Sequence, residues 1–188
     1  MPKKKKYNVF SISKQDVREL KDMDYDFTYG ELTKRGVVQL NTHIPKNIMQ
    51  GATFYDLGCG DGSLLLHLAD VNKDIPRLVG IELISERVES ALLKVSKKPA
   101  LKDRIEIIEG DVCDIICRGI NIVYVSNLCF PDHVNRKISN KLSDCLENNS
   151  IIFASKPLYI TLPYVLKTCK IHQSWSDKSE LLIYTISI

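Results

Sequence analysis

Three alternate glycines, Gly58, Gly60 and Gly62, separate an apolar segment from a helix-like segment. Glycine has no Cβ, so such a loop can turn sharply and let a ligand lie against the main chain. A dinucleotide-binding loop has the pattern Gly-x-Gly-x-x-Gly, and its third glycine would fall at Ser63. The spacing therefore indicates a small-molecule site but disfavours a nicotinamide dinucleotide.

Acidic residues surround this loop. Asp56 and Asp61 flank it and would repel a pyrophosphate, but they would attract the ammonium and sulfonium groups of S-adenosylmethionine. Glu82 follows the next apolar segment, where an acidic residue can accept hydrogen bonds from ribose hydroxyls, and Asp111 follows the third, where it can accept from an adenine amino group. Each acid alone could equally be a turn or helix-cap residue. Together they predict S-adenosylmethionine as the cofactor and S-adenosylhomocysteine as its product.

Alternating strands and helices are predicted to position these residues. Apolar, largely β-branched or aromatic segments predict strands at residues 53–57, 78–81, 105–108, 122–125 and 151–154. Helical periodicity predicts helices at residues 63–69, 85–96 and 132–146. This order implies a parallel sheet covered on both faces.

The carboxyl-terminal part departs from that alternation. Residues 170–174 and 181–188 are strand-like, and the short connection 175–180 predicts that they pair antiparallel. A mostly parallel sheet that ends in an antiparallel hairpin resembles the Rossmann-like, seven-stranded α/β fold of class I methyltransferases.

Length and composition fit one globular domain. The chain has 188 residues, 44% of them hydrophobic, which suffices for a single core. We expect a basic tail at residues 1–24 and a catalytic domain at residues 25–188, divided into a lead segment with a lid (25–50) and the core (51–188). No apolar run approaches the ~18 residues of a membrane span, and no hydrophobic segment follows the first charges. These features predict an intracellular protein with no membrane association.

Six cysteines then favour reduced thiols over a disulfide framework. Cys113 and Cys117 are the closest pair, but no second pair and no histidine at ligand spacing accompany them. No metal site is predicted.

The positive charge is concentrated at the amino terminus. The chain has 26 basic and 23 acidic residues, and without the four lysines Lys3, Lys4, Lys5 and Lys6 the count becomes 22 against 23. Such a run suits a polyanion or a nuclear-import receptor, or it is a solvated end that aids solubility.

The acceptor side is predicted after the fourth strand, where Asn127 and Phe130 follow Ser126. Methyl transfer needs an uncharged nucleophile, and a lysine with a pKa near 10.4 costs about 4.6 kcal/mol to deprotonate at pH 7. A neutral amide such as that of Asn127 could orient an amine, and Phe130 could wall a dry channel. Taken alone, the same residues fit an asparagine turn and a core phenylalanine.

Further segments make the resemblance more specific. In sequence order they are Thr28-Tyr29-Gly30-Glu31, Asp56-Leu57-Gly58-Cys59-Gly60-Asp61-Gly62, Gly80-Ile81-Glu82, Gly110-Asp111-Val112, Ser126-Asn127-Leu128-Cys129-Phe130, Ser155-Lys156-Pro157 and Ser174-Trp175-Ser176. This order resembles the Dot-one (disruptor of telomeric silencing) histone lysine methyltransferases over residues 25–188. The resemblance implies a nucleosomal substrate, a lysine on the globular core of histone three.

The resemblance also implies a role for each matching residue. The implied catalytic residues are Asn127, Phe130, Trp175 and Tyr29. The implied cofactor-binding residues are Tyr29, Gly30 and Glu31 as a lid, Asp56 and Gly58 at the amino-acid end, Gly60 and Gly62 in the loop, Glu82 at the ribose, Asp111 and Val112 at the adenine, and Asn127 between cofactor and target amine. Phe130 and Trp175 would wall the lysine channel, with Tyr25 and Phe27 at its mouth.

The sequence departs from the family pattern at Ser126, where a second asparagine is usual, and at Leu181-Leu182, where tyrosines are usual. We expect the run from Lys3 to Lys6 to replace the family's basic segments by binding nucleosomal DNA or an acidic histone surface, which implies a nuclear location. Two alternatives remain, a non-histone protein-lysine methyltransferase and an adenine-N6 nucleic-acid methyltransferase. The latter class places two prolines between its Asn or Asp and its aromatic residue, so that Asn127 and Phe130 match it in spacing only.

Overall fold

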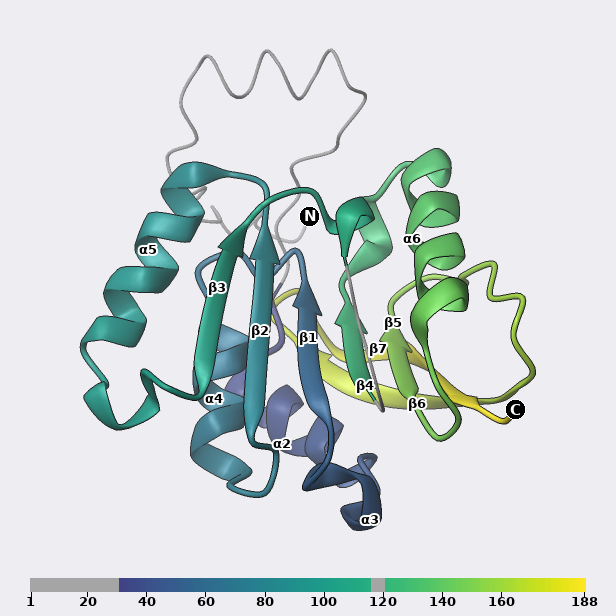
Figure 1. The fold of residues 1–188 in the computed structure, drawn as a ribbon, viewed down its shortest axis with the longest axis horizontal. Coiled ribbons are helices and arrows are strands. Elements are labelled where there is room, and N and C mark those ends of the chain that lie inside the picture. The colour runs from purple at the N-terminus through teal and green to yellow at the C-terminus, as the bar shows by residue number, and fades with distance from the viewer. Residues whose placement is uncertain (1–30, 116–120) are drawn as a thin grey trace, which may run out of the picture.

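One mixed sheet organises the structure, a computed structural model that describes residues 31–115 and 121–188. Within these ranges seven strands form the order β3-β2-β1-β4-β5-β7-β6 (Figure 1). Their bounds are β1 Thr53–Leu57, β2 Arg77–Glu82, β3 Ile105–Glu109, β4 Asn121–Val125, β5 Ile151–Ala154, β6 Tyr164–Gln173 and β7 Ser176–Ile186. The strands from β3 to β5 are parallel and β7 is antiparallel to both of its neighbours, which confirms the predicted fold class.

Helices pack on both faces of this sheet (Figure 1). Their bounds are α2 Lys34–Thr42, α3 Lys46–Met49, α4 Ser63–Val71, α5 Ser85–Ser96 and α6 Asp132–Cys145, with 3₁₀ turns η1 Pro99–Leu101, η2 Val112–Asp114 and η3 Asn127–Cys129. In the described part of the lead segment there are two helices, α2 and α3. None of the helices described here is long and apolar enough to cross a membrane.

Alternation along the strands divides the core into two layers. Phe54 of β1 packs with α2, α3 and α4, whereas Tyr55 and Leu57 pack with α6 on the opposite face. Successive strand residues point to opposite faces, so Asp56 lies on the α4 face with Phe54. Its register partner on β4 is Tyr124, which belongs to the same layer. Asp56 and Tyr124 are therefore neighbours on one face of the sheet.

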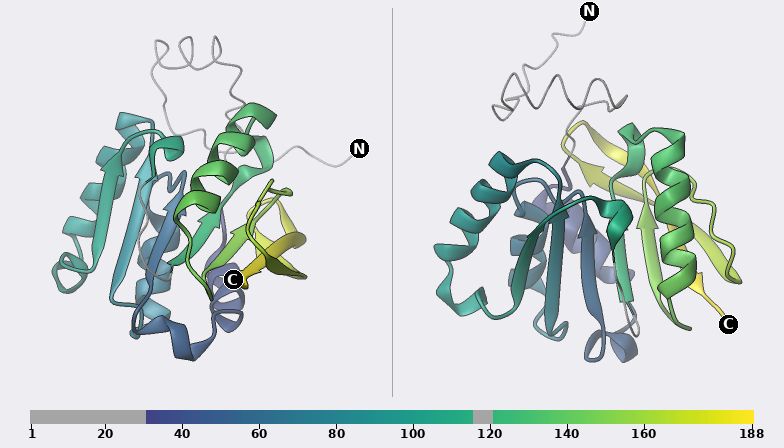
Figure 2. Two further views of the ribbon diagram at one scale, coloured as in Figure 1. Left: turned by 45° about the vertical axis from the view of Figure 1, so that its right-hand side comes forward. Right: turned by 45° about the horizontal axis from the view of Figure 1, so that its top comes forward.

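The antiparallel hairpin is longer than predicted. The strands β6 and β7 cover most of residues 164–186, and only Ser174 and Trp175 connect them, so the predicted bounds of 170–174 and 181–188 were too narrow. Residues 164–170 and 176–180 are exposed or half-buried, and β6 is the edge strand of the sheet. The polar and charged residues 176–180 lack the apolar pattern that identifies a strand, whereas Tyr164, Val165 and Leu166 are apolar but exposed. The two strands extend beyond the parallel ones (Figure 2).

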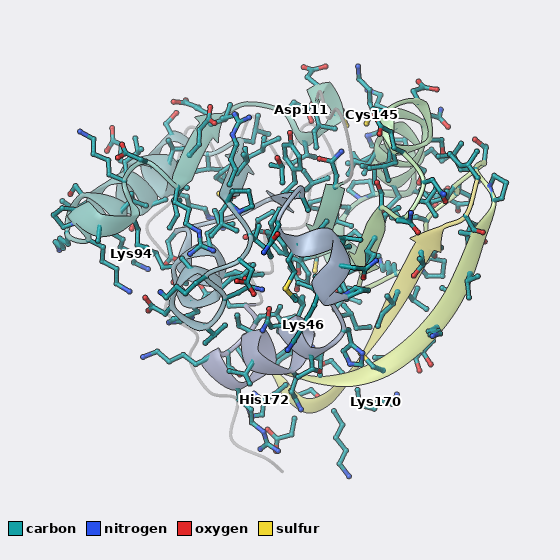
Figure 3. All side chains as sticks on the ribbon, turned by 60° about the horizontal axis from the view of Figure 1, so that its bottom comes forward. Lys46, Lys94, Asp111, Cys145, Lys170 and His172 are labelled. Atoms are coloured by element: carbon teal, nitrogen blue, oxygen red, sulfur yellow. The ribbon has the colours of Figure 1, made fainter. Side chains whose placement is uncertain are left out.

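Helix α2 packs against strand β6 of the hairpin. The Thr33 hydroxyl caps the helix by accepting from the Gly36 amide at 3.2 Å, and it lies 2.8 Å from Nδ1 of His172. Gln39 Oε1 accepts from the His172 amide at 2.9 Å. Figure 3 labels His172 at this contact. These contacts fix the chain just before α2, where the Ser174 amide donates to the Glu31 carbonyl at 2.9 Å.

One cysteine departs from the prediction of reduced thiols. Cys145, the last residue of α6, is disulfide-bonded. Cys59, Cys113 and Cys169 carry free thiols.

Gly36→Ala should loosen the seating of α2, because a Cβ at this position would lie 2.1 Å from the carbonyl oxygen of His172. Overpacking of this kind costs about 1–3 kcal/mol. We expect a fall of that size in the free energy of unfolding, measured by urea denaturation. Gly51→Ala is the matched control, because a Cβ there meets nothing within 4 Å. Equal stability of the two variants would contradict the close α2–β6 contact.

Candidate functional site

A pocket lies at the carboxyl ends of β1 and β4, on the α4 face of the sheet. Its lining residues are Glu31, Leu32, Asp56, Gly58, Cys59, Ser63, Leu64, Tyr124 and Ser126. The strand order reverses between β1 and β4, and open α/β sheets bind ligands at such a switch point. Three predicted cofactor residues, Glu31, Asp56 and Gly58, meet in this pocket.

The glycine loop forms one wall of the pocket through its unusual backbone. Gly58, Gly60 and Gly62 all have positive φ angles, of 82°, 55° and 72°, which side-chain-bearing residues rarely adopt. The amide of Gly58 donates to the Ile81 carbonyl at 2.8 Å, so the turn is fixed to β2. A Cβ on Gly58 would lie 3.4 Å from the ring of Phe130. The structure thus brings Phe130 against the bare backbone of the loop.

The carboxylate of Glu82 holds the loop from the end of β2. Its Oε2 accepts from the Gly60 amide at 2.8 Å, and its Oε1 accepts from the Ile84 amide at 3.0 Å. Glu82 is buried, so these charge-assisted bonds fix its orientation. Each oxygen retains a lone pair that could accept from a hydroxyl group of a bound ligand.

Asp56 is the most perturbed carboxyl group lining the pocket. Burial and the nearby carboxylates of Glu82, Glu31 and Asp61 raise the pKa of Asp56 to about 8. The group is therefore mostly protonated at pH 7 in the ligand-free protein. A cation bound beside it would favour the ionised form.

Asp61 does not line the pocket. Its carboxylate accepts from the Ser63 amide at 3.1 Å and forms an ion pair with Lys94 of α5, which Figure 3 labels. Burial raises the pKa of Asp61, but hydrogen bonds from Lys94 and Ser63 outweigh it and the net shift is downward. The predicted attraction of Asp61 for the cofactor is untested, and in the ligand-free protein its carboxylate is paired with Lys94.

In this structure the Asn127 side chain joins the segment after β5 to helix α6. Its Oδ1 accepts from the amides of Ser155 and Lys156, both at 2.9 Å, and its Nδ2 donates to Asn135 Oδ1 at 2.8 Å and to the Lys156 carbonyl at 3.2 Å. An amide side chain has two donor hydrogens and two lone pairs, so all are used. Because these groups are all hydrogen-bonded within the protein, none is left for a target amine in this arrangement, and the predicted role of Asn127 is untested.

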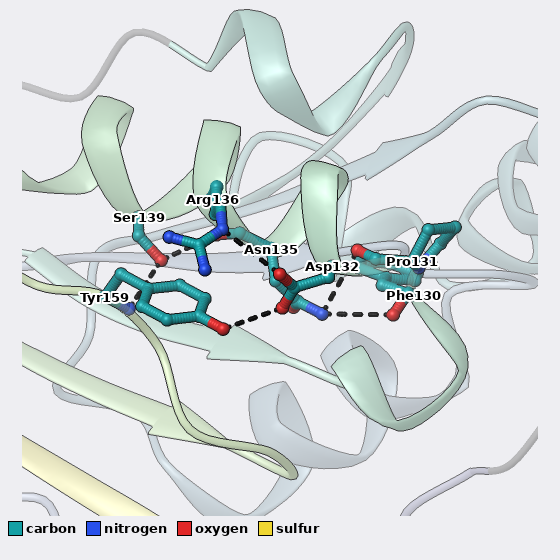
Figure 4. Close-up of polar contacts among 7 residues, drawn as sticks. All are labelled: Phe130, Pro131, Asp132, Asn135, Arg136, Ser139 and Tyr159. Carbon is teal, nitrogen blue, oxygen red and sulfur yellow. Dashed lines mark hydrogen bonds and ion pairs between the residues drawn. The ribbon is translucent and has the colours of Figure 1, made fainter.

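The hydrogen bonds of Asn127 continue through Asn135 of α6, which positions Phe130. Asn135 Nδ2 donates to the carbonyl of Phe130 at 3.0 Å (Figure 4). The Tyr159 hydroxyl donates to Asp132 at 2.7 Å, and the guanidinium of Arg136 lies 4.0 Å from the centre of the Tyr159 ring. These contacts join the segment after β5 to the start of α6. The position of Phe130 is therefore set by the scaffold.

Two predicted adenine contacts lie outside the pocket. Asp111 caps η2 by accepting from the Cys113 amide at 2.8 Å, and Val112 is buried among apolar residues of the α6 layer. Neither lines the pocket, and their predicted role is untested.

Trp175 stands in the hairpin turn with 36% of its surface exposed. Its neighbour Ser174 accepts from the Glu31 amide at 3.2 Å through Oγ, which places the turn beside the pocket wall. The predicted residues Tyr29, Gly30, Tyr25 and Phe27, and the lysines Lys3 to Lys6, lie outside the described residues.

Neither Tyr124 nor Ser126 is among the predicted site residues, yet both line the pocket. The signal that could have identified them is strand alternation, because residues two apart on β4 share a face with Asp56 of β1. The apolar side chains around Tyr124 make it read as an ordinary core residue.

Comparison with known proteins shows similarity to a methyltransferase and to a synthase of an S-adenosylmethionine derivative. No family model matches the chain. The chain is 31% identical over 111 residues to a protein-lysine N-methyltransferase of Saccharolobus islandicus, covering 58% of this chain and 65% of the relative. It is 30% identical over 120 residues to a carboxy-S-adenosyl-L-methionine synthase of Wolinella succinogenes, covering 61% and 46%. The chain thus spans less than two thirds of either relative.

Solved structures share the fold at low identity. An RNA methyltransferase from Salinibacter ruber in complex with S-adenosyl-L-homocysteine has a TM-score of 0.63 at 20% identity, covering 84% of this chain and 94% of that one. The methyltransferase domain of bacterial CtHen1-C has a TM-score of 0.66 at 13% identity, covering 84% and 100%. The chain has the class I S-adenosylmethionine-dependent methyltransferase fold.

Proposed function

We propose that this protein is an S-adenosylmethionine-dependent protein-lysine N-methyltransferase. The observation that carries the proposal is the buried carboxyl group of Asp56, raised in pKa by its neighbouring carboxylates, beside the bare backbone of Gly58. Such a site gains free energy from a cationic ligand and loses it with an anionic one. The similarity to a protein-lysine N-methyltransferase supports the choice of lysine as acceptor.

The residues present fit this cofactor. When bound, S-adenosylmethionine supplies an electrophilic methyl group on a sulfonium. Asp56 would hold its positively charged end, and Glu82, already oriented by two backbone amides, would accept from the ribose hydroxyls. Phe130, packed against Gly58, would exclude water from the reacting centre. The enzyme would act mainly by positioning two reactants.

We propose histone three in the nucleosome as the acceptor, on the resemblance of the ordered segments described above. In this proposal Lys3 to Lys6 contact DNA and the protein acts in the nucleus. A non-histone lysine acceptor is the alternative that the sequence similarity to the Saccharolobus islandicus enzyme favours. For an RNA acceptor the support is a shared fold at 20% identity.

A transfer assay distinguishes these acceptors. The protein should move labelled methyl groups from S-adenosylmethionine to lysine when incubated with nucleosomes, and we expect less label on free histones, on an unrelated lysine-rich protein and on RNA. Mass spectrometry of the products locates the label.

Glu82→Gln should weaken cofactor binding by at least about tenfold, or ~1.4 kcal/mol, because it removes the oriented negative charge. Glu106→Gln is the matched control, since Glu106 is exposed on β3 and pairs with Arg77. In the transfer assay described above, methyl label found on RNA alone would reject lysine as the acceptor.

Asp56→Asn should stabilise the ligand-free protein and weaken its binding of S-adenosylmethionine. In the ligand-free wild-type protein the pKa of Asp56 is raised from 3.8 to about 8, so its contribution to stability falls as pH rises from about 4 to 8. The variant lacks this loss, and we expect it to be more stable than wild type at pH 8 by about 1 kcal/mol or more. Thermal unfolding without ligand measures this difference.

The same variant should bind S-adenosylmethionine more weakly and lose part of the pH dependence of binding. Wild-type affinity should rise between pH 6 and 9 as Asp56 becomes easier to ionise, whereas the ionisation of the cofactor itself is common to both proteins. Calorimetry at several pH values gives both curves, with exposed Asp70→Asn as the control. Parallel curves for wild type and Asp56→Asn would remove Asp56 from cation binding.

A further inference from the structure

Three buried polar atoms at or next to the pocket make no close, well-aligned hydrogen bond among the described residues. They are Oη of Tyr124, Oγ of Ser155 and Nε2 of Gln173. Tyr124 is 3% exposed and Gln173 is 2% exposed. Buried polar groups are almost always paired, and an unpaired one costs stability. Three such atoms in one place indicate a site built to receive a polar group.

The three side chains come from different strands but converge on the same point. Tyr124 lines the pocket from β4, Ser155 follows β5, and Gln173 ends β6 next to the hairpin turn. Burial and the nearby carboxyl group of Asp56 raise the pKa of the Tyr124 phenol. Weak hydrogen bonding from the side chains of Ser126, Gln173 and Ser155 acts in the opposite direction without reversing this shift. The phenol is therefore neutral at pH 7 and retains both its donor and its acceptor capacity.

The chemistry of the cluster fits an uncharged primary amine. The oxygens of Tyr124 and Ser155 can each accept one N–H, while the Gln173 amino group can only donate and so can orient the tyrosine oxygen. An amine held by its two N–H groups keeps its lone pair for attack on the methyl carbon. A hydroxyl acceptor has one O–H and would leave one oxygen of the pair without a donor.

We propose that Tyr124, with Ser155 and Gln173, binds the two N–H groups of the target lysine amine and limits the reaction to the first methyl group. This inference rests on the proposed function. In the step, the amine nitrogen forms the N–C bond with its lone pair while the C–S bond breaks and its electrons stay on sulfur. The resulting methylammonium passes its extra proton to solvent after it leaves the site.

The limit on methylation follows from the count of N–H groups. A monomethylated amine has one N–H and a methyl group in place of the other, so one of the two oxygens is left unpaired when it binds again. An unsatisfied buried group of this kind costs enough to slow a second transfer about tenfold or more. Removing the tyrosine hydroxyl removes that penalty.

The test compares Tyr124→Phe with Tyr184→Phe. Tyr184 is also buried, but its hydroxyl oxygen accepts from the Leu158 amide at 3.0 Å, so the control removes a hydroxyl that the fold uses. Mass spectrometry measures the mono- and dimethylated fractions on the same lysine at equal total methyl transfer. We expect mostly monomethylation by wild type, a rise of about tenfold in the dimethylated fraction with Tyr124→Phe, and no change with Tyr184→Phe.

The unfolding temperature provides a second readout. If the fold needed the Tyr124 hydroxyl, removing it would lower this temperature. Tyr124→Phe should keep or raise the unfolding temperature, because it removes an unpaired group, whereas Tyr184→Phe should lower it. Ser155→Ala should raise dimethylation in the same direction as Tyr124→Phe. Equal product distributions in wild type, Tyr124→Phe and Ser155→Ala at matched turnover would overturn the inference and leave the proposed function standing. Absence of any lysine product would overturn both.

Discussion

The burial of one carboxyl group, that of Asp56, is the constraint around which the site is arranged. Its strand ends beneath a loop of three positive-φ glycines, and Glu82 and Glu31 add negative charge nearby. The ligand-free protein accommodates this by keeping Asp56 protonated. The arrangement lowers stability at neutral pH and is expected to recover it when a cation binds, as is common where function requires a destabilised site. A fold selected for stability alone would place an apolar residue there.

Buried polar residues of the scaffold and of the site differ in how fully their side chains are hydrogen-bonded. Every donor and acceptor of the Asn127 side chain is occupied by the ends of β5 and α6, so this residue holds strand ends together. Tyr124, three residues earlier, is also buried, but its hydroxyl makes no close, well-aligned hydrogen bond among the described residues. The two polar groups thus have opposite roles, although composition and position in the sequence make Asn127 the more conspicuous candidate.

The sequence was sufficient for the elements whose signals are local. Apolar strands and the glycine loop are read from short windows, and a mostly parallel sheet with a terminal antiparallel hairpin follows from the alternation of strands and helices. Contacts between distant segments were not predictable in this way. Lys94 neutralises Asp61 from 33 residues away, and nothing near either residue signals that pairing. The hairpin length was also missed, since β7 begins with the polar residues 176–180.

The hairpin and the parallel core supply different parts of the site. The parallel strands supply Asp56, Glu82 and the loop, which suit a cofactor and leave the acceptor open. The hairpin contributes Gln173 to the polar cluster, and through Ser174 it fixes Glu31 at the pocket wall. Gly36 permits this contact by letting α2 approach the carbonyl of His172. Acceptor choice can therefore change through the hairpin and lead segment while the cofactor half stays constant, because the two halves are carried by different parts of the sheet.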